Sequence, residues 1–277
     1  MQAAYQSTYS CSAERQGEEM TVKSVLISTD YEVSAQIVVD VRSFKIKYAR
    51  WDAFRLPEGY TFIEKEIPDL IGLDAYFYSG REIRQAIDEE LDGIPLELII
   101  ECIRGVGQAE AFLIPERGFP ILKEFDEYCH KIGKDSCRYY SNLDRIAMSW
   151  TEYMGEHSLE RNKGLFDRHK NYQIFLKPDG SFLTTAGFTD TFHEILLVTS
   201  LTQDGLVSEC SGDFLRGPDQ VCFENVALLP ELIGKKLVAI NKKELAALVG
   251  GSLGCTHLYE MFWDLGRAMT EVIAKKP

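Results

Sequence analysis

The stretch LPELIGKKLVAINKKELAALVGGSL, residues 229–253, repeats an earlier part of the same chain. It aligns without a gap on IPDLIGLDAYFYSGREIRQAIDEEL, residues 67–91, at a constant offset of 162. Six of the 25 positions are identical, whereas roughly one or two identities are expected from average composition. We therefore interpret the chain as an internal duplication.

The flanking segments follow the same order of patterns in both copies. Residues 31–54 and 192–215 are rich in strand-forming side chains and are each broken by a polar turn. Residues 95–113 and 257–275 carry apolar side chains at helical spacing. The sequence thus predicts an α+β protein with two tandem related domains, each an antiparallel β-meander followed by helices.

The expected domain boundaries follow from the extent of the two copies. We assign residues 1–19 to an N-terminal tail, 20–115 to a first, degenerate repeat and 161–277 to a second repeat. Residues 116–160 have no counterpart in the first copy. Their apolar spacing predicts a helical insert of two helices that separate near Gly133.

Composition excludes several classes of function. The formal net charge of −13 over 277 residues argues against nucleic acid as a partner. No apolar run is long enough for a membrane span, and residues 1–20 lack the features of a signal peptide. We therefore expect a cytoplasmic protein whose seven cysteines are reduced thiols. We expect a metal or a small molecule as its ligand, and make no prediction of its oligomeric state.

Four chemically reactive residues occur in the second copy only. At the offset of 162, their counterparts are a serine, a tyrosine, a glycine and a proline: Asp190 aligns with Ser28, Cys222 with Tyr60, Cys255 with Gly93 and His257 with Pro95. Because the apolar pattern persists in both copies without these groups, the fold does not require them. They are candidates for function.

The strongest local signal is Cys255, which directly precedes a predicted helix. A helix N-terminus lowers the pKa of a cysteine and favours the thiolate, which is a nucleophile and a metal ligand. Cys255 and His257 are two residues apart, so they share no face of a regular helix. They converge only if Cys255 lies in extended backbone at or before the cap.

Each candidate also has an ordinary structural interpretation. Cys222 alone is typical of a packing residue, His257 of a first-turn histidine and Asp190 of a turn acid. His193 and Glu194 follow Asp190 closely and point to opposite faces of a strand. One of them could support a ligand or act as a general base.

The second copy resembles a bacterial domain-of-unknown-function family. The shared motifs are Gly-Cys-Thr-His-Leu at 254–258, Pro-x-x-x-Cys at 218–222 and LxGxxL at 232–237. More distantly, the order of elements is similar to iron–sulfur scaffold proteins of the IscU/NifU/SufU type. That resemblance implies an IscU-like fold and zinc or iron held by four ligands: Asp190, Cys222, Cys255 and His257. The chain departs from the scaffold pattern because threonines, not a cysteine, flank Asp190, and because Thr256 separates Cys255 from His257.

Three functions remain open from the sequence. The first is a metal- or thiol-centred site in the second repeat that binds zinc or iron. The second is a metal-free enzyme that acts on a small molecule in a cleft between the repeats, with catalytic candidates Cys255, His257, His193 and Glu194. The third is a non-catalytic module that binds a ligand or a protein.

Overall fold

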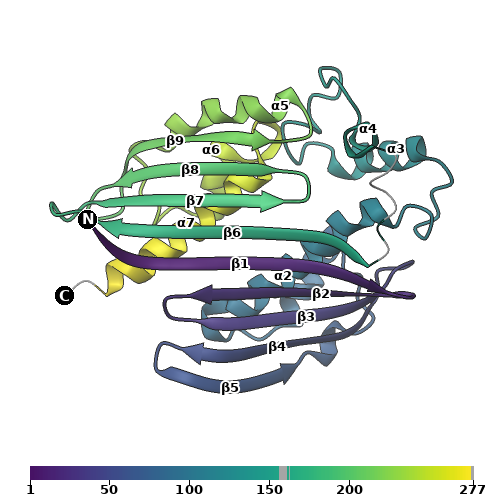
Figure 1. Ribbon diagram of the computed structural model, residues 1–277, viewed down its shortest axis with the longest axis horizontal. Coiled ribbons are helices and arrows are strands. Elements are labelled where there is room, and N and C mark those ends of the chain that lie inside the picture. Colours follow the sequence, from purple (N-terminus) through teal and green to yellow (C-terminus); the bar gives the residue numbers. More distant parts are fainter. Residues whose placement is uncertain (156–160, 162, 276–277) are drawn as a thin grey trace. The chain divides into compact units, whose positions relative to one another are not determined.

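A computed structural model describes residues 1–155, 161 and 163–275 (Figure 1). The chain is a mixed α+β protein, as the sequence predicts, and it contains a large antiparallel sheet. Two compact units can be distinguished, and each is described by itself. The first unit comprises Thr8–Phe125 and Met154–His169, and the second comprises Met1–Ser7, Asp126–Tyr153 and Lys170–Pro277.

In the first unit, a meander of antiparallel strands precedes the helices. The strands are β2 (Glu19–Ser28), β3 (Glu32–Asp40), β4 (Ile46–Leu56) and β5 (Gly59–Glu66). The helices are α1 (Gly80–Gln85) and α2 (Ile94–Ala109), with short 3-10 helices η1 (Pro68–Leu70), η2 (Phe77–Ser79), η3 (Leu91–Gly93) and η4 (Glu110–Phe112). Buried and exposed residues alternate along β2, and α2 packs against β2 and β3.

Two long strands contribute residues to both units. They are β1 (Gln2–Gln16) and β6 (Gly164–Leu176). Residues 1–19 were expected to form a tail. Instead, they form β1 and reach the start of β2. Residue 160, at the expected end of the insert, lies outside the described residues. The remaining domain boundaries stay predictions.

The second unit has a similar order of elements. Its meander consists of β7 (Phe182–Asp190), β8 (Glu194–Leu201) and β9 (Val207–Arg216). Its helices are most of α3 (Leu122–Gly133) and α4 (Trp150–Met154), and all of α5 (Gln220–Phe223), α6 (Lys242–Val249) and α7 (Thr256–Ala274), with 3-10 helices η6 (Glu224–Leu232) and η7 (Gly251–Leu253). Helix α7 packs against α6 and β7 through an apolar face at helical spacing: Leu258, Met261, Phe262, Leu265 and Met269.

Elements of the same kind lie 162 residues apart in the two units. Strands β3 and β8 begin at Glu32 and Glu194, and helices α2 and α7 begin at Ile94 and Thr256. Gly72 and Gly234 both have a positive φ, +87° and +81°, which favours glycine. The units differ after the meander, where β5 in the first unit aligns with α5 and the start of η6 in the second.

The insert is less helical than its apolar spacing predicts. Helix α3 ends at Gly133 as expected, but the second helix is reduced to α4, five residues long. Between them, the side chain of Asn142 donates to the Arg138 carbonyl and accepts from the Arg145 guanidinium. Side chains of this type compete with helical backbone hydrogen bonds, which explains the shorter helix.

Across the described part of the chain, none of the helices combines the length and apolar character needed to cross a bilayer.

Candidate metal site

The turn between β7 and β8 is built around the carboxylate of Asp190. Its Oδ1 accepts hydrogen bonds from the backbone N–H groups of Phe192 at 2.7 Å and His193 at 2.5 Å. From β9, the guanidinium of Arg216 donates to the carbonyl oxygens of Asp190, Thr191 and His193. The turn is therefore fixed from both sides, so the directions of the Asp190 and His193 side chains are set by the backbone.

A second element of the site is the N-terminus of α7. Cys255 is the N-cap residue in extended backbone, with φ −129° and ψ 127°, as its spacing from His257 requires. Its N–H donates to the Val249 carbonyl at 2.7 Å. A Cβ on Gly254 would lie 2.3 Å from the same carbonyl oxygen, so only glycine fits there. This close approach fixes the start of α7 and, with it, His257 on the first turn.

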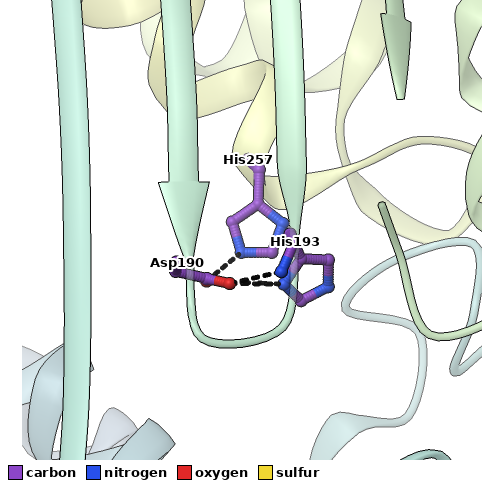
Figure 2. Close-up of side chains that lie close together, drawn as sticks. All are labelled: Asp190, His193 and His257. Atoms are coloured by element: carbon purple, nitrogen blue, oxygen red, sulfur yellow. Dashed lines mark hydrogen bonds and ion pairs between the residues drawn. The ribbon is translucent and has the colours of Figure 1, made fainter. Parts of the chain in front are cut away.

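Together, the turn and the helix bring one carboxylate and two imidazoles into a cluster (Figure 2). One ligand atom from each of Asp190, His193 and His257 lies within 4.8 Å of the others. Asp190 Oδ2 is 4.0 Å from His257 Nε2, and Asp190 Oδ1 is 3.1 Å from His193 Nδ1. Neutral imidazole and carboxylate are ligands of zinc and iron, so this cluster could hold a metal ion.

The cluster is largely buried among aromatic rings. The exposed fraction is 1% for the Asp190 side chain, 9% for His193 and 15% for His257. The ring centroids of Phe188 and His257 lie 4.5 Å apart, and those of Trp150 and His193 lie 6.3 Å apart. The two imidazoles retain limited contact with solvent, so an ion there would be mostly shielded from water.

Cys255 contacts the cluster but is not among its three residues. Its Sγ lies 3.7 Å from His257 Nδ1, which is the ring nitrogen that does not face Asp190. Burial raises the pKa of the Cys255 thiol above its ordinary value, although the backbone N–H groups of Leu258 and His257 act in the opposite direction. The expected thiolate at a helix N-terminus is therefore not favoured, because desolvation outweighs the helix end.

Two further sequence candidates lie outside the cluster. Cys222 is buried in α5, and burial raises the pKa of its thiol to about 12. It is not part of the three-residue group, so the four expected ligands are only partly brought together.

Glu194 begins β8, pairs with Thr189 across the hairpin and is half-buried. His193, expected only as a supporting group or base, is a full member of the cluster. At the offset of 162, His193 aligns with Tyr31, so the comparison of the two copies could have selected it in the same way as Asp190 and His257.

The insert contacts the loops that carry these residues. The N–H of Arg138 donates to the Gly254 carbonyl at 2.7 Å, and its guanidinium to the Leu253 carbonyl at 2.6 Å. The hydroxyl of Tyr153 donates to the Phe192 carbonyl at 2.7 Å. The insert therefore helps to fix both the start of α7 and the β7–β8 turn.

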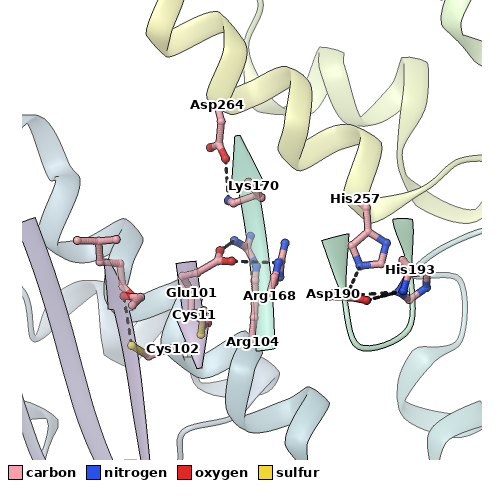
Figure 3. A network of polar contacts seen from close by, with 12 residues as sticks. Cys11, Glu101, Cys102, Arg104, Arg168, Lys170, Asp190, His193, His257 and Asp264 are labelled. Atoms are coloured by element: carbon pink, nitrogen blue, oxygen red, sulfur yellow. Dashed lines mark hydrogen bonds and ion pairs between the residues drawn. The ribbon is translucent and has the colours of Figure 1, made fainter. Parts of the chain in front are cut away.

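A buried ion pair anchors α7 farther along its length. Lys170 Nζ on β6 lies 2.7 Å from Asp264 Oδ2 (Figure 3), and the Tyr172 hydroxyl donates to the same oxygen at 3.0 Å. All three side chains are buried. Because a buried carboxylate needs such partners, the pair fixes the position of the helix that carries His257.

Comparison with known proteins supports the expected resemblance of the second half. Among curated proteins, no sequence matches this chain. A family model described as "Protein of unknown function (DUF2889)" matches residues 166–271, a segment that contains all three residues of the cluster.

Proposed function

We propose that the protein binds zinc or iron through Asp190, His193 and His257. The observation that carries the proposal is the convergence of three ligand atoms within 4.8 Å from two separate elements. Two histidines and one carboxylate are the donor set of many catalytic zinc sites and of non-haem iron sites. Three protein ligands leave coordination positions for water or a small molecule, so the ion would act as a Lewis acid on a bound ligand.

The test is metal analysis of protein purified without a histidine tag. We expect about one equivalent of zinc or iron, either after purification or after anaerobic reconstitution. His193→Ala and His257→Ala should each lose this binding. His169→Ala is the matched control, because it removes an exposed imidazole from β6 outside the cluster. Absence of metal after reconstitution, or equal binding by all three variants, would refute the proposal.

Thiol chemistry is the second candidate, and one contact favours it. Cys255 Sγ, the His257 ring and Asp190 Oδ2 follow one another at 3.7 Å and 4.0 Å, in the order of a nucleophile, a base and an orienting acid. The buried thiol with its raised pKa argues against it. Rapid alkylation of Cys255 near pH 7, with His257→Ala slowing the reaction, would favour a metal-free enzyme. A non-catalytic binding module would remain if neither metal nor thiol reactivity is found.

We also infer that the chain arose by duplication and that the second unit kept or acquired the site. The equal spacing of β3 and β8 and of α2 and α7 supports this. An IscU-like arrangement of each unit remains part of this proposal, and the order of a meander followed by helices is the observation behind it. We do not carry over Cys222 as a ligand, because it lies outside the three-residue group.

A further inference from the structure

The two ring nitrogens of His257 face different neighbours, and Figure 2 shows the contact with Asp190. Nε2 lies 4.0 Å from Asp190 Oδ2, and Nδ1 lies 3.7 Å from Cys255 Sγ. A neutral imidazole carries its proton on one nitrogen and offers a lone pair on the other. Metal binding by His257 on the Asp190 side therefore requires the proton to sit on Nδ1, next to the sulfur.

We propose that Cys255 is a positioning residue whose sulfur accepts the Nδ1–H of His257 and so directs the Nε2 lone pair toward Asp190 and His193. Both this role and the tautomer rest on the function proposed above, because it is the metal on Nε2 that requires the proton on Nδ1. Metal-bound histidines generally donate their second N–H to an acceptor that fixes the ring and its tautomer. Here that acceptor is a cysteine sulfur.

The backbone around Cys255 makes this role more consistent than direct ligation. The residue is fixed by its N–H bond to Val249, and its carbonyl accepts from the Tyr259 N–H at 3.1 Å. The sulfur thus stays beside Nδ1, whereas the ligand atoms of the cluster gather around Nε2. Thr256, the residue between, bonds to the Ser136 carbonyl through its hydroxyl and further limits movement of this segment.

The first experiment measures the tautomer of His257 in zinc-loaded protein labelled with ¹⁵N-histidine. Two-bond nitrogen–proton spectra should show the proton on Nδ1 in the wild type. Cys255→Ala should shift His257 to a mixture of tautomers, and Cys255→Ser should partly retain the wild-type state because a hydroxyl oxygen can also accept. Cys210→Ala is the matched control, since it removes a thiol on β9 outside the cluster. Amide spectra of each variant verify folding.

The second experiment measures metal binding directly. Cys255→Ala should weaken zinc binding by roughly 10–100-fold, the usual effect of losing such a partner. Wild-type protein loaded with Co²⁺ should lack the intense near-ultraviolet band of a thiolate ligand. A band that disappears in Cys255→Ser would make Cys255 a ligand and overturn the proposal.

The two proposals can fail separately. An unchanged tautomer in Cys255→Ala, or a wild-type proton on Nε2, would overturn the role of Cys255 even if the metal binds. A wild-type protein that binds no zinc would instead refute the metal site, on which the role of Cys255 rests.

Discussion

The turns at residues 28–31 and 190–193 have the same backbone and different chemistry. In the first unit, Ser28 Oγ accepts from the N–H groups of Asp30 and Tyr31, as Asp190 Oδ1 does from Phe192 and His193. The side chain of Arg55 donates to three carbonyls of the first turn, in the way that Arg216 does in the second: those of Ser28, Thr29 and Tyr31. The turn therefore does not depend on a carboxylate. Asp190 meets the structural need that a serine meets elsewhere and, in addition, presents an oxygen to His257.

The largest expected effect concerns the buried ion pairs on β6. Arg168 Nε lies 3.0 Å from Glu101 on α2 in the first unit, as Lys170 contacts Asp264 on α7 in the second. Lys170→Met should lower the free energy of unfolding by about 3–5 kcal/mol, because it leaves the buried Asp264 carboxylate without its cation. Arg168→Met should cost less, because Arg104 still contacts Glu101 at 3.1 Å. Urea denaturation measures this. Losses below 1 kcal/mol in both variants would show that the pairs do not fix the helices.

The next prediction concerns the exchange of Asp190 and Ser28, the residues that distinguish the two turns. Asp190→Ser gives the second turn the residue of the first, so the turn should persist while zinc affinity falls at least about 100-fold, more than the loss of an indirect partner. Isothermal titration calorimetry measures the affinity. The reciprocal variant Ser28→Asp should create no zinc site, since the first unit has Tyr31 and Pro95 at the positions of the two histidines. Zinc binding retained by Asp190→Ser would remove Asp190 from the ligand set.

Removing the arginine tests the shared backbone of the turns. Arg216→Ala and Arg55→Ala should each cost roughly 1–3 kcal/mol of stability, because each loses charge-assisted hydrogen bonds to backbone carbonyls. Only Arg216→Ala should also weaken metal binding. Thermal denaturation combined with zinc titration separates the two effects. If Arg55→Ala lowered zinc affinity equally, the two turns would not be independent.

The last effect is a pH dependence shared by both units, and it is smallest near neutral pH, where both thiols are protonated whether the chain is folded or unfolded. Burial raises the pKa of Cys102 on α2 to about 12, as it does for Cys222 on α5, from an ordinary value near 9. A raised pKa stabilises the folded protein below pH 9, and this stability is lost as the pH rises toward 12. The free energy of unfolding should thus fall by about 1.4 kcal/mol per pH unit for each thiol above pH 9.

Alanine variants isolate these contributions. Cys102→Ala and Cys222→Ala should each have a shallower decline between pH 9.5 and 11 in urea denaturation, on the order of one proton fewer. Tyrosines and lysines titrate in the same pH range, so the test compares the pH slope of the free energy of unfolding in each variant with that of the wild type. A slope identical to that of the wild type would mean that the thiol is not desolvated in the folded state.

The meanders and the final helices were predictable because they leave a periodic apolar pattern that recurs after 162 residues. Strand β1 was not, since its buried side includes small and polar residues such as Ser7, Cys11 and Ala13. These side chains give no hydrophobic alternation, so the segment was expected to be a tail. The insert was predicted as two helices, yet local hydrogen bonds of Asn142 replace most of the second.

The site was partly predictable for a similar reason. Comparison of the copies selects Asp190 and His257, because a chemical difference on a shared frame is visible in one sequence. His193 belongs to the cluster because the β7–β8 turn places it beside Asp190, and the local sequence indicates the geometry of this turn only weakly. Cys222 lies outside the three-residue group, on α5, where the second unit departs from the element order of the first.

The contacts of Arg138 and Tyr153 have a practical consequence for anyone who isolates the segment that matches the family model. A fragment trimmed to 166–271 would contain all three candidate ligands and yet lack both side chains that hold the two loops in register. Zinc binding by such a fragment would report on loops that have lost two of their supports. The 277-residue chain is therefore the material on which the proposed site should be tested.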